Sequence, residues 1–411
     1  MSLFELGAIL LVLTAAFGWI NHRLAYLPHT VGLLVMGLGA SLVIIGAEAA
    51  LPGLLHYEDL VGLVRQVGFQ ETVLDGMLAF LLFAGALHVD APSLRNRAWT
   101  IGTMATVGVL LSTAIIGTGL WAAAKGLGIA MPLPWALVFG ALISPTDPVA
   151  VLATLKEVKV PSDLQTLMTG ETLFNDGVGV VLFAVLVQAA AGGSIEPLHI
   201  GEMFLLEALG GAALGGVTGY VAYRAMRAID DYTIEVLISL ALVVGTYAVA
   251  ARLHMSGPLA VVVAGLLIGS PGPRDSFSDE TQRYLFGFWT LLDEMLNSVL
   301  FLLIGLEVLV LRFEPAFGWL MAVAVPLALV ARLAAVSGPV LLMGRFRSFL
   351  PGTIPVLTWG GLRGGISVAL ALSIPEVAEK SAILAATYAV VIFTLIVQGL
   401  SLRAVIQRVL K

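Results

Sequence analysis

Charge is scarce in this sequence. Asp, Glu, Lys and Arg make up 12% of its 411 residues, and hydrophobic residues make up 59%, whereas an ordinary soluble domain is about a quarter charged. A soluble fold cannot bury that much apolar surface, so the composition predicts a protein that lies in a membrane. The net charge of −6 is spread over short segments and offers no basic patch to nucleic acid.

Cysteine is absent. This excludes disulfides, thiol chemistry and cysteine metal sites, although it says nothing about the compartment. The six histidines show no spacing typical of a metal centre. These absences give no support to a cofactor or to an enzymatic activity, and we expect neither.

Long uncharged apolar runs are abundant instead. Leu24–Ala47, Ala98–Ala124 and Ser381–Leu402 each reach or approach the ~20 residues with which a helix crosses a bilayer. The runs are continuous and not alternating, which favours helices. We predict an all-α polytopic membrane protein with about thirteen transmembrane helices. The predicted spans are 3–21, 30–51, 73–90, 98–124, 133–155, 165–191, 203–223, 233–253, 255–270, 285–311, 315–343, 353–373 and 381–402.

The basic residues predict the orientation of these spans. Fourteen of the 21 Lys and Arg residues fall in alternate loops or at the C-terminus, and five fall in the opposite loops. Because cytoplasmic loops are enriched in Lys and Arg, we expect a periplasmic N-terminus and a cytoplasmic C-terminus in the cell inner membrane. The remaining two, Arg332 and Arg363, fall inside predicted spans.

The span order indicates an inverted repeat. Thirteen spans divide into six, one linking helix and six, so the second half starts on the opposite side of the membrane. In each half the fifth span is interrupted by helix breakers, at 144–148 and 359–365. Broken helices at corresponding positions point to the binding site of a secondary transporter. The alternative is two unrelated kinks, because no residue-level repeat accompanies the symmetry.

The first break presents cation ligands. Pro145 and Pro148 lack N–H groups, which leaves two carbonyls without helical partners, and each proline disfavours helical geometry in the residue before it. The unwound stretch therefore offers carbonyl oxygens, the Thr146 hydroxyl and the Asp147 carboxylate. Because intramembrane carboxylates are costly and usually line ion or proton paths, we interpret this break as functional.

The sixth span carries two acidic residues. Thr172 and Asp176 share one helix face, and Glu171 and Asn175 share the neighbouring one. Nineteen uncharged residues follow Asp176, so this isolated anion should bind either a proton or a cation. The alternative for Asp176 is a structural ion pair. Glu171 fits that role better, and we predict that it pairs with Arg363.

Three strings of the sequence then carry a family resemblance. They are Ser-Pro-Thr-Asp-Pro-Val-Ala-Val (144–151), Gly-Glu-Thr-Leu-Phe-Asn-Asp-Gly-Val-Gly-Val-Val (170–181) and Trp-Gly-Gly-Leu-Arg-Gly-Gly (359–365). Their order and the span pattern over essentially the whole chain resemble NhaP-type sodium/proton antiporters of the cation:proton antiporter superfamily. The resemblance implies a homodimer. Each protomer would have a scaffold domain, 1–97 and 198–314, and a mobile core domain, 98–197 and 315–411.

The resemblance also implies an activity and its residues. The activity is secondary antiport of a monovalent cation for H⁺, with Na⁺ favoured, Li⁺ accepted and K⁺ a further candidate. With one titrating carboxylate beside the neutral Asn175, the exchange should be electroneutral and one for one. The implied ion and proton site is the carrier Asp176 with Asn175, Thr172, Thr146 and Asp147; the implied structural residues are the pair Glu171–Arg363 and Arg332.

One position departs from the family pattern. Ala84 stands where many relatives have an acidic residue, which affects the coordination shell and the choice of ion. Asp293, Glu294 and Glu307 lie within or at the ends of the tenth span. They could line a funnel to the site or be solvated charges at helix ends.

Two other functions compete with antiport. A Na⁺-coupled symporter of a small organic solute could use a similar repeat, but the polar groups converge on one small cation site. A membrane scaffold or sensor would leave the buried acidic residues and arginines without a role.

Overall fold

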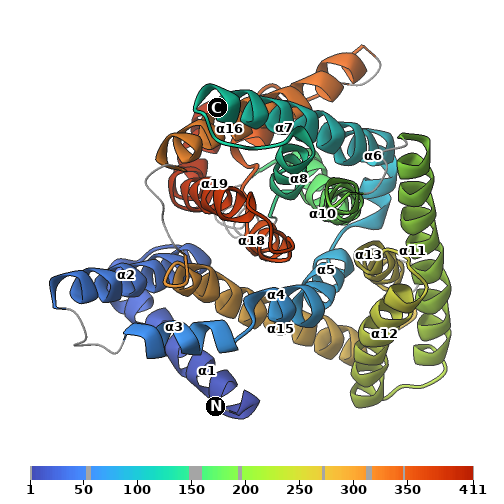
Figure 1. Cartoon of the computed structure of the whole chain (residues 1–411). Helices are drawn as coiled ribbons and strands as arrows, with labels where there is room; N and C mark the ends of the chain where they lie inside the picture. Colours follow the sequence, from blue (N-terminus) through green and yellow to red (C-terminus); the bar gives the residue numbers. More distant parts are fainter. Residues whose placement is uncertain are drawn as a thin grey trace.

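The computed structural model describes residues 2–51, 57–147, 160–192, 197–270, 274–311, 317–345 and 348–410. All regular structure in these ranges is helical (Figure 1), which confirms the all-α prediction. The first nine helices are α1 (Leu3–Ile20), α2 (His29–Ala50), α3 (Tyr57–Gln66), α4 (Phe69–Glu71), α5 (Leu78–Leu87), α6 (Ala91–Thr103), α7 (Val109–Gly126), α8 (Leu133–Ile143) and α10 (Ser162–Ala190). The others are α11 (Pro197–Met226), α12 (Tyr232–Arg252), α13 (Gly257–Gly269), α15 (Asp279–Glu307), α16 (Gly318–Met343), α17 (Thr353–Trp359), α18 (Gly365–Leu372), α19 (Lys380–Phe393) and α20 (Gly399–Val409).

Many of these helices are long enough to cross a bilayer. Within the described ranges, nine helices have the length and hydropathy of a span, and a bent pair that runs from α3 through α5 brings the number to ten. Two further apolar helices, α8 and α13, are shorter. The chain is therefore a multi-pass membrane protein, and the count of thirteen stays a prediction.

Polar side chains define where several helices begin. Asp90, Asp231, Ser256 and Ser278 each precede a helix and accept a hydrogen bond from a backbone N–H of its first turn. Such caps satisfy donors that the helix itself leaves unpaired. The short loops at these positions therefore set the ends of the membrane helices.

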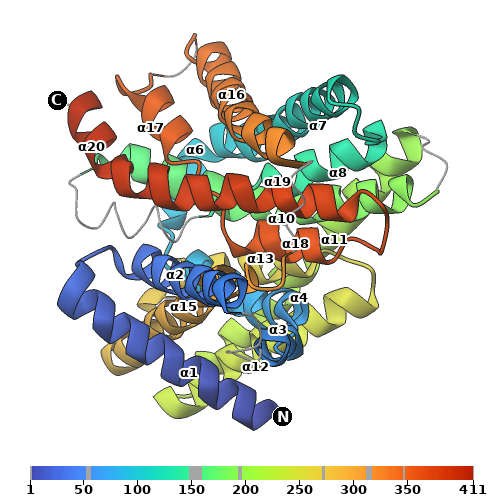
Figure 2. The ribbon, with the colours of Figure 1, turned by 60° about the vertical axis from the view of Figure 1, so that its left-hand side comes forward.

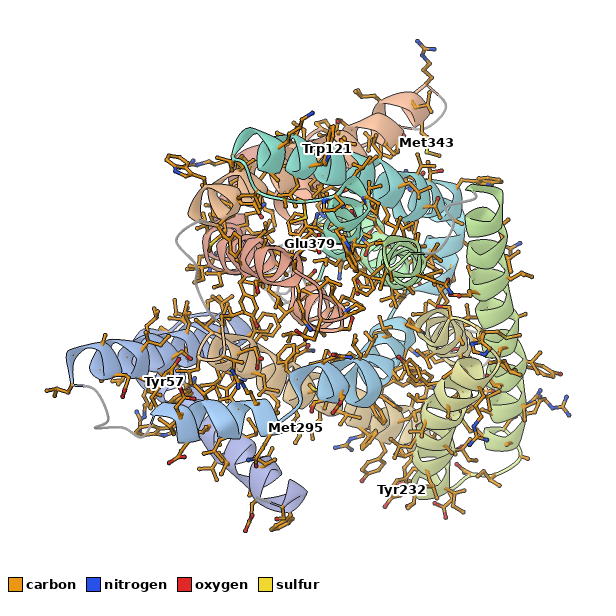
Figure 3. The ribbon with its side chains drawn as sticks, in the orientation of Figure 1. Tyr57, Trp121, Tyr232, Met295, Met343 and Glu379 are labelled. Carbon is orange, nitrogen blue, oxygen red and sulfur yellow. The ribbon has the colours of Figure 1, made fainter. Side chains whose placement is uncertain are left out.

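Large apolar side chains cover the outer surface. Trp99, Trp319 and Leu206 are exposed by 78%, 72% and 66%, and Figure 3 shows side chains projecting outward around Trp121 and Met343. Contiguous apolar surface of this kind is unfavourable in water and favourable against hydrocarbon. The helices therefore present their outer faces to lipid.

The helices form two groups (Figures 1 and 2). In one group α7 packs on α8 and α16, α10 packs on α8, and α19 packs on α16 and α18. In the other α2 packs on α15, and α13 packs on α5, α11 and α12. Contacts of α10 with α11 and α13 join the two groups. The division into a scaffold and a mobile core stays a prediction.

Two non-helical stretches meet inside the first group. Helix α8 ends at Ile143, and helices α17 and α18 are separated by residues 360–364. The N–H of Asp147 donates to the carbonyl of Leu362 at 2.8 Å, so the two unwound stretches are bonded to each other. Ser144 keeps helical dihedral angles, so the first break begins at Pro145 and not before it. Pro148 and the rest of that span lie outside the described residues.

Candidate ion-binding site

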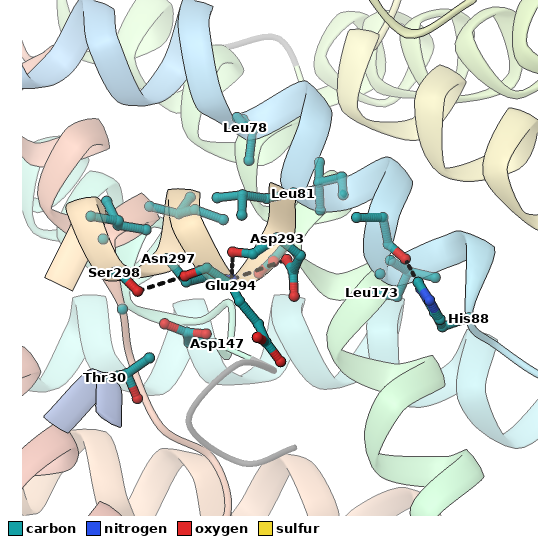
Figure 4. A pocket seen from close by; sticks show the side chains of 18 of the residues that line it. Thr30, Leu78, Leu81, His88, Asp147, Leu173, Asp293, Glu294, Asn297 and Ser298 are labelled. Carbon is teal, nitrogen blue, oxygen red and sulfur yellow. Dashed lines mark hydrogen bonds between the residues drawn. The ribbon is translucent and has the colours of Figure 1, made fainter. Parts of the chain in front are cut away.

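A cavity of about 640 Å³ reaches the crossing of the broken helices. Its walls come from α2, α5, α10, α15, α18 and the stretch that follows α8 (Figure 4). Four carboxylates line it: Asp147, Asp176, Asp293 and Glu294. Hard oxygen ligands of this kind suit a hard cation.

Asp176 is the most deeply buried of these carboxylates. Its exposure is 2%, and within the described part of the chain its Oδ2 has no hydrogen-bond partner. The face of α10 that lines the cavity comprises Gln165, Thr169, Leu173 and Asp176, which follow the three- and four-residue spacing of one helix face. Because a buried, unsatisfied anion is costly, Asp176 should take up a proton or a cation from this cavity.

The other predicted ligands of α10 hold the first break in place. Asn175 donates from Nδ2 to the hydroxyl of Thr146 at 2.9 Å and accepts from the Thr146 N–H at 3.3 Å. The Thr146 hydroxyl donates to that of Thr172 at 3.3 Å, and Thr172 donates to the Met168 carbonyl at 2.7 Å. Thr146 lines the cavity, whereas Thr172 and Asn175 lie behind it. Thr172 therefore holds the first break in place whereas Asp176 lines the cavity, although the two residues are one turn apart on α10.

Asp147 lies against the second break. A Cβ on Gly364 would come within 1.8 Å of Asp147 Oδ2, so a side chain at position 364 would displace the Asp147 carboxylate. Gly364 is the residue that immediately precedes α18. Because the aligned peptide dipoles favour negative charge at a helix N-terminus, α18 stabilises the Asp147 carboxylate.

The predicted ion pair between Glu171 and Arg363 is wrong. Glu171 instead makes a bidentate pair with Arg332 of α16, through Nη1 to Oε1 and through Nη2 to Oε2 at 2.7 Å. Arg332 also donates to the Leu357 carbonyl from Nε at 3.2 Å and from Nη2 at 3.0 Å. Both charges are buried, so this pair joins three helices of the first group.

The reason for the change of partner is local geometry. Arg363 sits within the second break, and its Nη1 folds back to the Gly361 carbonyl at 3.1 Å. Gly361 leaves room for Arg332, because a Cβ there would lie 2.5 Å from Arg332 Nε. The two guanidinium groups thus bind carbonyls near the C-terminus of α17, where the helix dipole favours positive charge.

Ala84, the departure from the family pattern, is on the cavity wall. It is buried on α5. One turn later His88 contacts the Ala84 carbonyl through Nδ1 at 2.7 Å and the Thr290 hydroxyl through Nε2 at 2.9 Å. The wall therefore presents a methyl group and no carboxylate at position 84.

The sequence allows Asp293 and Glu294 either to line a funnel or to be solvated charges, and the structure places both on the cavity wall. Glu307, at the end of α15, is not part of that wall and is buried. The sequence reasoning missed His29, Thr169 and Thr290, which also line the cavity. The signal that could have found Thr290 is its spacing of three and four residues from Asp293 and Glu294.

Comparisons with known proteins identify the family of this chain. A family model described as "Sodium/hydrogen exchanger, transmembrane" matches residues 9–408. The Na(+)/H(+) antiporter NhaP of Pseudomonas aeruginosa is 44% identical over 98% of this chain and 96% of its own length. The Na(+)/H(+) antiporter NhaH of Halobacillus aidingensis is 35% identical over 90% of this chain and 91% of its own.

The solved structures add a shared fold. The sodium proton antiporter MjNhaP1 from Methanocaldococcus jannaschii matches 99% of this chain and 98% of its own with a TM-score of 0.74 and 20% identity. The family match covers nearly all of the sequence, including both broken helices and Asp176. This chain belongs to the sodium/hydrogen exchanger family.

Proposed function

We propose that this chain is a secondary antiporter that exchanges Na⁺ for H⁺ across the cell inner membrane by alternating access. Li⁺ is a second substrate and K⁺ a further candidate. The observation that carries the proposal is Asp176, a buried carboxylate whose Oδ2 has no partner in the described residues and which lines a cavity. The relatives are named Na(+)/H(+) antiporters, and nothing supports the symporter.

The exchange follows from the electrostatics of one site. Asp176 is neutralised either by a proton or by a cation that it holds with Thr146, Asp147 and nearby carbonyls. An empty, anionic site crosses the membrane poorly, because an uncompensated charge at mid-membrane is costly. That penalty favours exchange over leak. Thr172 and Asn175 serve this site by holding Thr146 in place.

The cavity supports an inward-facing state. It is lined by His88 at the end of α5 and by Gln165 near the start of α10, both of which the basic-residue pattern places toward the cytoplasm. Farther along α15, Phe301 and Ile304 pack in a buried apolar cluster with Leu34 of α2. Core helices contribute Tyr388 and Val391 to that cluster. The described cavity therefore lies toward the predicted cytoplasmic side.

Orientation and assembly are part of the proposal. We place the N-terminus in the periplasm, the C-terminus in the cytoplasm, and two copies of the chain in a homodimer joined by their scaffold domains. Because the sequence has no cysteine, a single cysteine added at either terminus gives an unambiguous labelling test with a membrane-impermeant reagent. Native mass spectrometry of the detergent-solubilised protein tests the dimer.

A proteoliposome assay tests the function. The purified protein is reconstituted with a pH dye inside, and Na⁺, Li⁺, K⁺ or choline is added outside in turn. We expect Na⁺ and Li⁺ to drive H⁺ efflux from the vesicle and choline to drive none. Equal responses to Na⁺ and choline would contradict cation/proton exchange. A requirement for an organic solute would support the symporter instead.

A further inference from the structure

Helix α15 carries a polar stripe inside the membrane. Its members are Thr290, Asp293, Glu294, Asn297 and Ser298, and all five line the cavity. Their spacing of three and four residues places them on one helix face. The residues that follow, from Leu300 to Leu306, are all buried and carry no polar side chain. The stripe therefore ends near the end of the cavity.

Asn297 has an acceptor that no group in the described residues satisfies. The side chain is 1% exposed, and its Nδ2 donates to the Asp293 carbonyl at 2.9 Å and to Asp293 Oδ1 at 3.0 Å. Since carbonyl and carboxylate oxygens only accept, Asp293 fixes the orientation of the amide. The amide oxygen Oδ1 is left without a hydrogen-bond partner, although buried acceptors are normally satisfied.

The stripe and Ala84 of α5 line the same cavity. His88 of α5 contacts the Thr290 hydroxyl of α15, which brings the two helices together at the cavity. Ala84 is one turn from His88, and Asp293 is about one turn from Thr290. Figure 4 shows Asp293 and Asn297 on α15 and Asp147 beside the same space. Oxygen ligands are thus present on both sides of the cavity.

We propose that Asp293 and Asn297 form a cation subsite on α15 that takes a monovalent alkali cation with part of its water shell. The inference rests on the proposed antiport and adds a scaffold-side ligand set to it. Asn297 Oδ1 meets the cation directly, and the Asp293 carboxylate supplies the charge that Ala84 does not. The subsite receives the cation from the cytoplasmic side and passes it to Asp176.

The first test is the apparent KM for Na⁺ in proteoliposomes. We expect Asp293→Asn and Asn297→Ala each to raise KM about tenfold, equivalent to about 1.4 kcal/mol, while the maximal rate at saturating Na⁺ stays within about twofold of the unmodified protein. Glu280→Gln is the matched control, because it removes one charge from an exposed position of the same helix that does not line the cavity. An exposed charge is screened, so its KM should change by less than about threefold.

The second test is a rescue that a structural role cannot produce. Ala84→Glu in the Asp293→Asn background returns a carboxylate to the same cavity from α5. We expect KM to fall back to within about threefold of the unmodified protein, since electrostatic attraction of the cation depends on the charge in the cavity and not on its helix. If Asp293 acted only through its hydrogen bond inside α15, a carboxylate on α5 would not restore KM.

The outcomes separate the subsite from the function. Absence of Na⁺/H⁺ exchange in the unmodified protein overturns the proposed function. Exchange with a normal KM in both Asp293→Asn and Asn297→Ala overturns the subsite alone. Elution volume and melting temperature establish that each variant folds. If Asp293→Asn does not fold, the test rests on Asn297→Ala. A KM of that variant within twofold of the unmodified protein would then overturn the subsite.

Discussion

Two regions of α10, five residues apart, treat a buried carboxylate in opposite ways. The Glu171 carboxylate is fully paired, because Arg332 binds both of its oxygens and also donates to the Leu357 carbonyl near the end of α17. Around Asp176 one oxygen has no hydrogen-bond partner in the described residues, and the residue borders a cavity. Burial alone therefore does not identify an ion carrier. A carrier is a buried charge whose partner has been left for the substrate to supply.

The largest effect should come from removing the unsatisfied charge. Asp176→Asn should reduce cation-driven proton flux in proteoliposomes to the level of empty vesicles, because the site can no longer alternate between a proton and a cation. Asp163→Asn is the matched control, since it makes the same substitution at an exposed, ion-paired position of the same helix. Flux near the unmodified level in Asp176→Asn, with normal elution and melting, would remove Asp176 as the carrier.

Substitutions in the Glu171–Arg332 ion pair should lower the stability of the protein. Breaking a buried ion pair by neutralising one partner strands the other charge and costs about 3–5 kcal/mol. Glu171→Gln and Arg332→Gln should each lower the melting temperature strongly, and the double variant should recover much of the loss. Arg363→Gln provides the contrast, because Arg363 bonds the Gly361 carbonyl and should couple more weakly to Glu171. A larger coupling energy with Arg363 than with Arg332 would reverse this assignment.

The pH dependence of transport should arise from Asp176, the carboxylate without a full set of hydrogen-bond partners among the described residues. A proton and a cation compete for Asp176, so protonation at low pH removes the cation site. The apparent cation affinity should weaken as pH falls, by about tenfold per unit in the limit where the protonated form dominates, and added Na⁺ should restore the rate. The measurement is KM for Na⁺ across a pH series. A KM that stays constant from acid to neutral pH would contradict competition.

The smallest expected effect is that of voltage. With one titrating carboxylate beside the neutral Asn175, both loaded forms of the site carry the same net charge. Moving one net charge per cycle would be worth ~2.3 kcal/mol at 100 mV, so an electrogenic carrier responds visibly. Clamping the vesicle potential with K⁺ and valinomycin should leave Na⁺/H⁺ exchange unchanged. A rate that follows the sign of the potential would make Asp147 a second titrating group.

The sequence predicted much of the fold because its signals are local. Apolar runs, prolines and glycines located the membrane helices and the break between α17 and α18. Helix breakers and buried charges are visible without a structure, so Thr146, Asp147 and Asp176 could be predicted, and the structure places all three on the cavity wall; their role as ion ligands stays a prediction. The spans could not be counted from hydropathy alone, since short or bent helices such as α8 fall below the usual length of a span.

What the sequence did not predict depends on contacts between distant segments. The choice of Arg332 over Arg363 as the partner of Glu171 is decided by the room that Gly361 leaves, and no spacing rule contains that information. Thr172 shares a helix face with Asp176, yet it accepts a hydrogen bond from Thr146 and does not line the cavity. The position of Asp293 on the cavity wall required knowing which face of α15 meets α5.

The hydrogen bond from the Asp147 N–H to the Leu362 carbonyl makes the two breaks depend on each other. A regular helix through residue 147 would send that N–H to the carbonyl of Ile143, four residues earlier, and Leu362 would lose its donor in a place that water does not reach. Straightening one helix therefore leaves a defect in the other. An engineer who wished to build an uninterrupted bundle from this sequence would have to replace Pro145 and the glycines of 360–365 together.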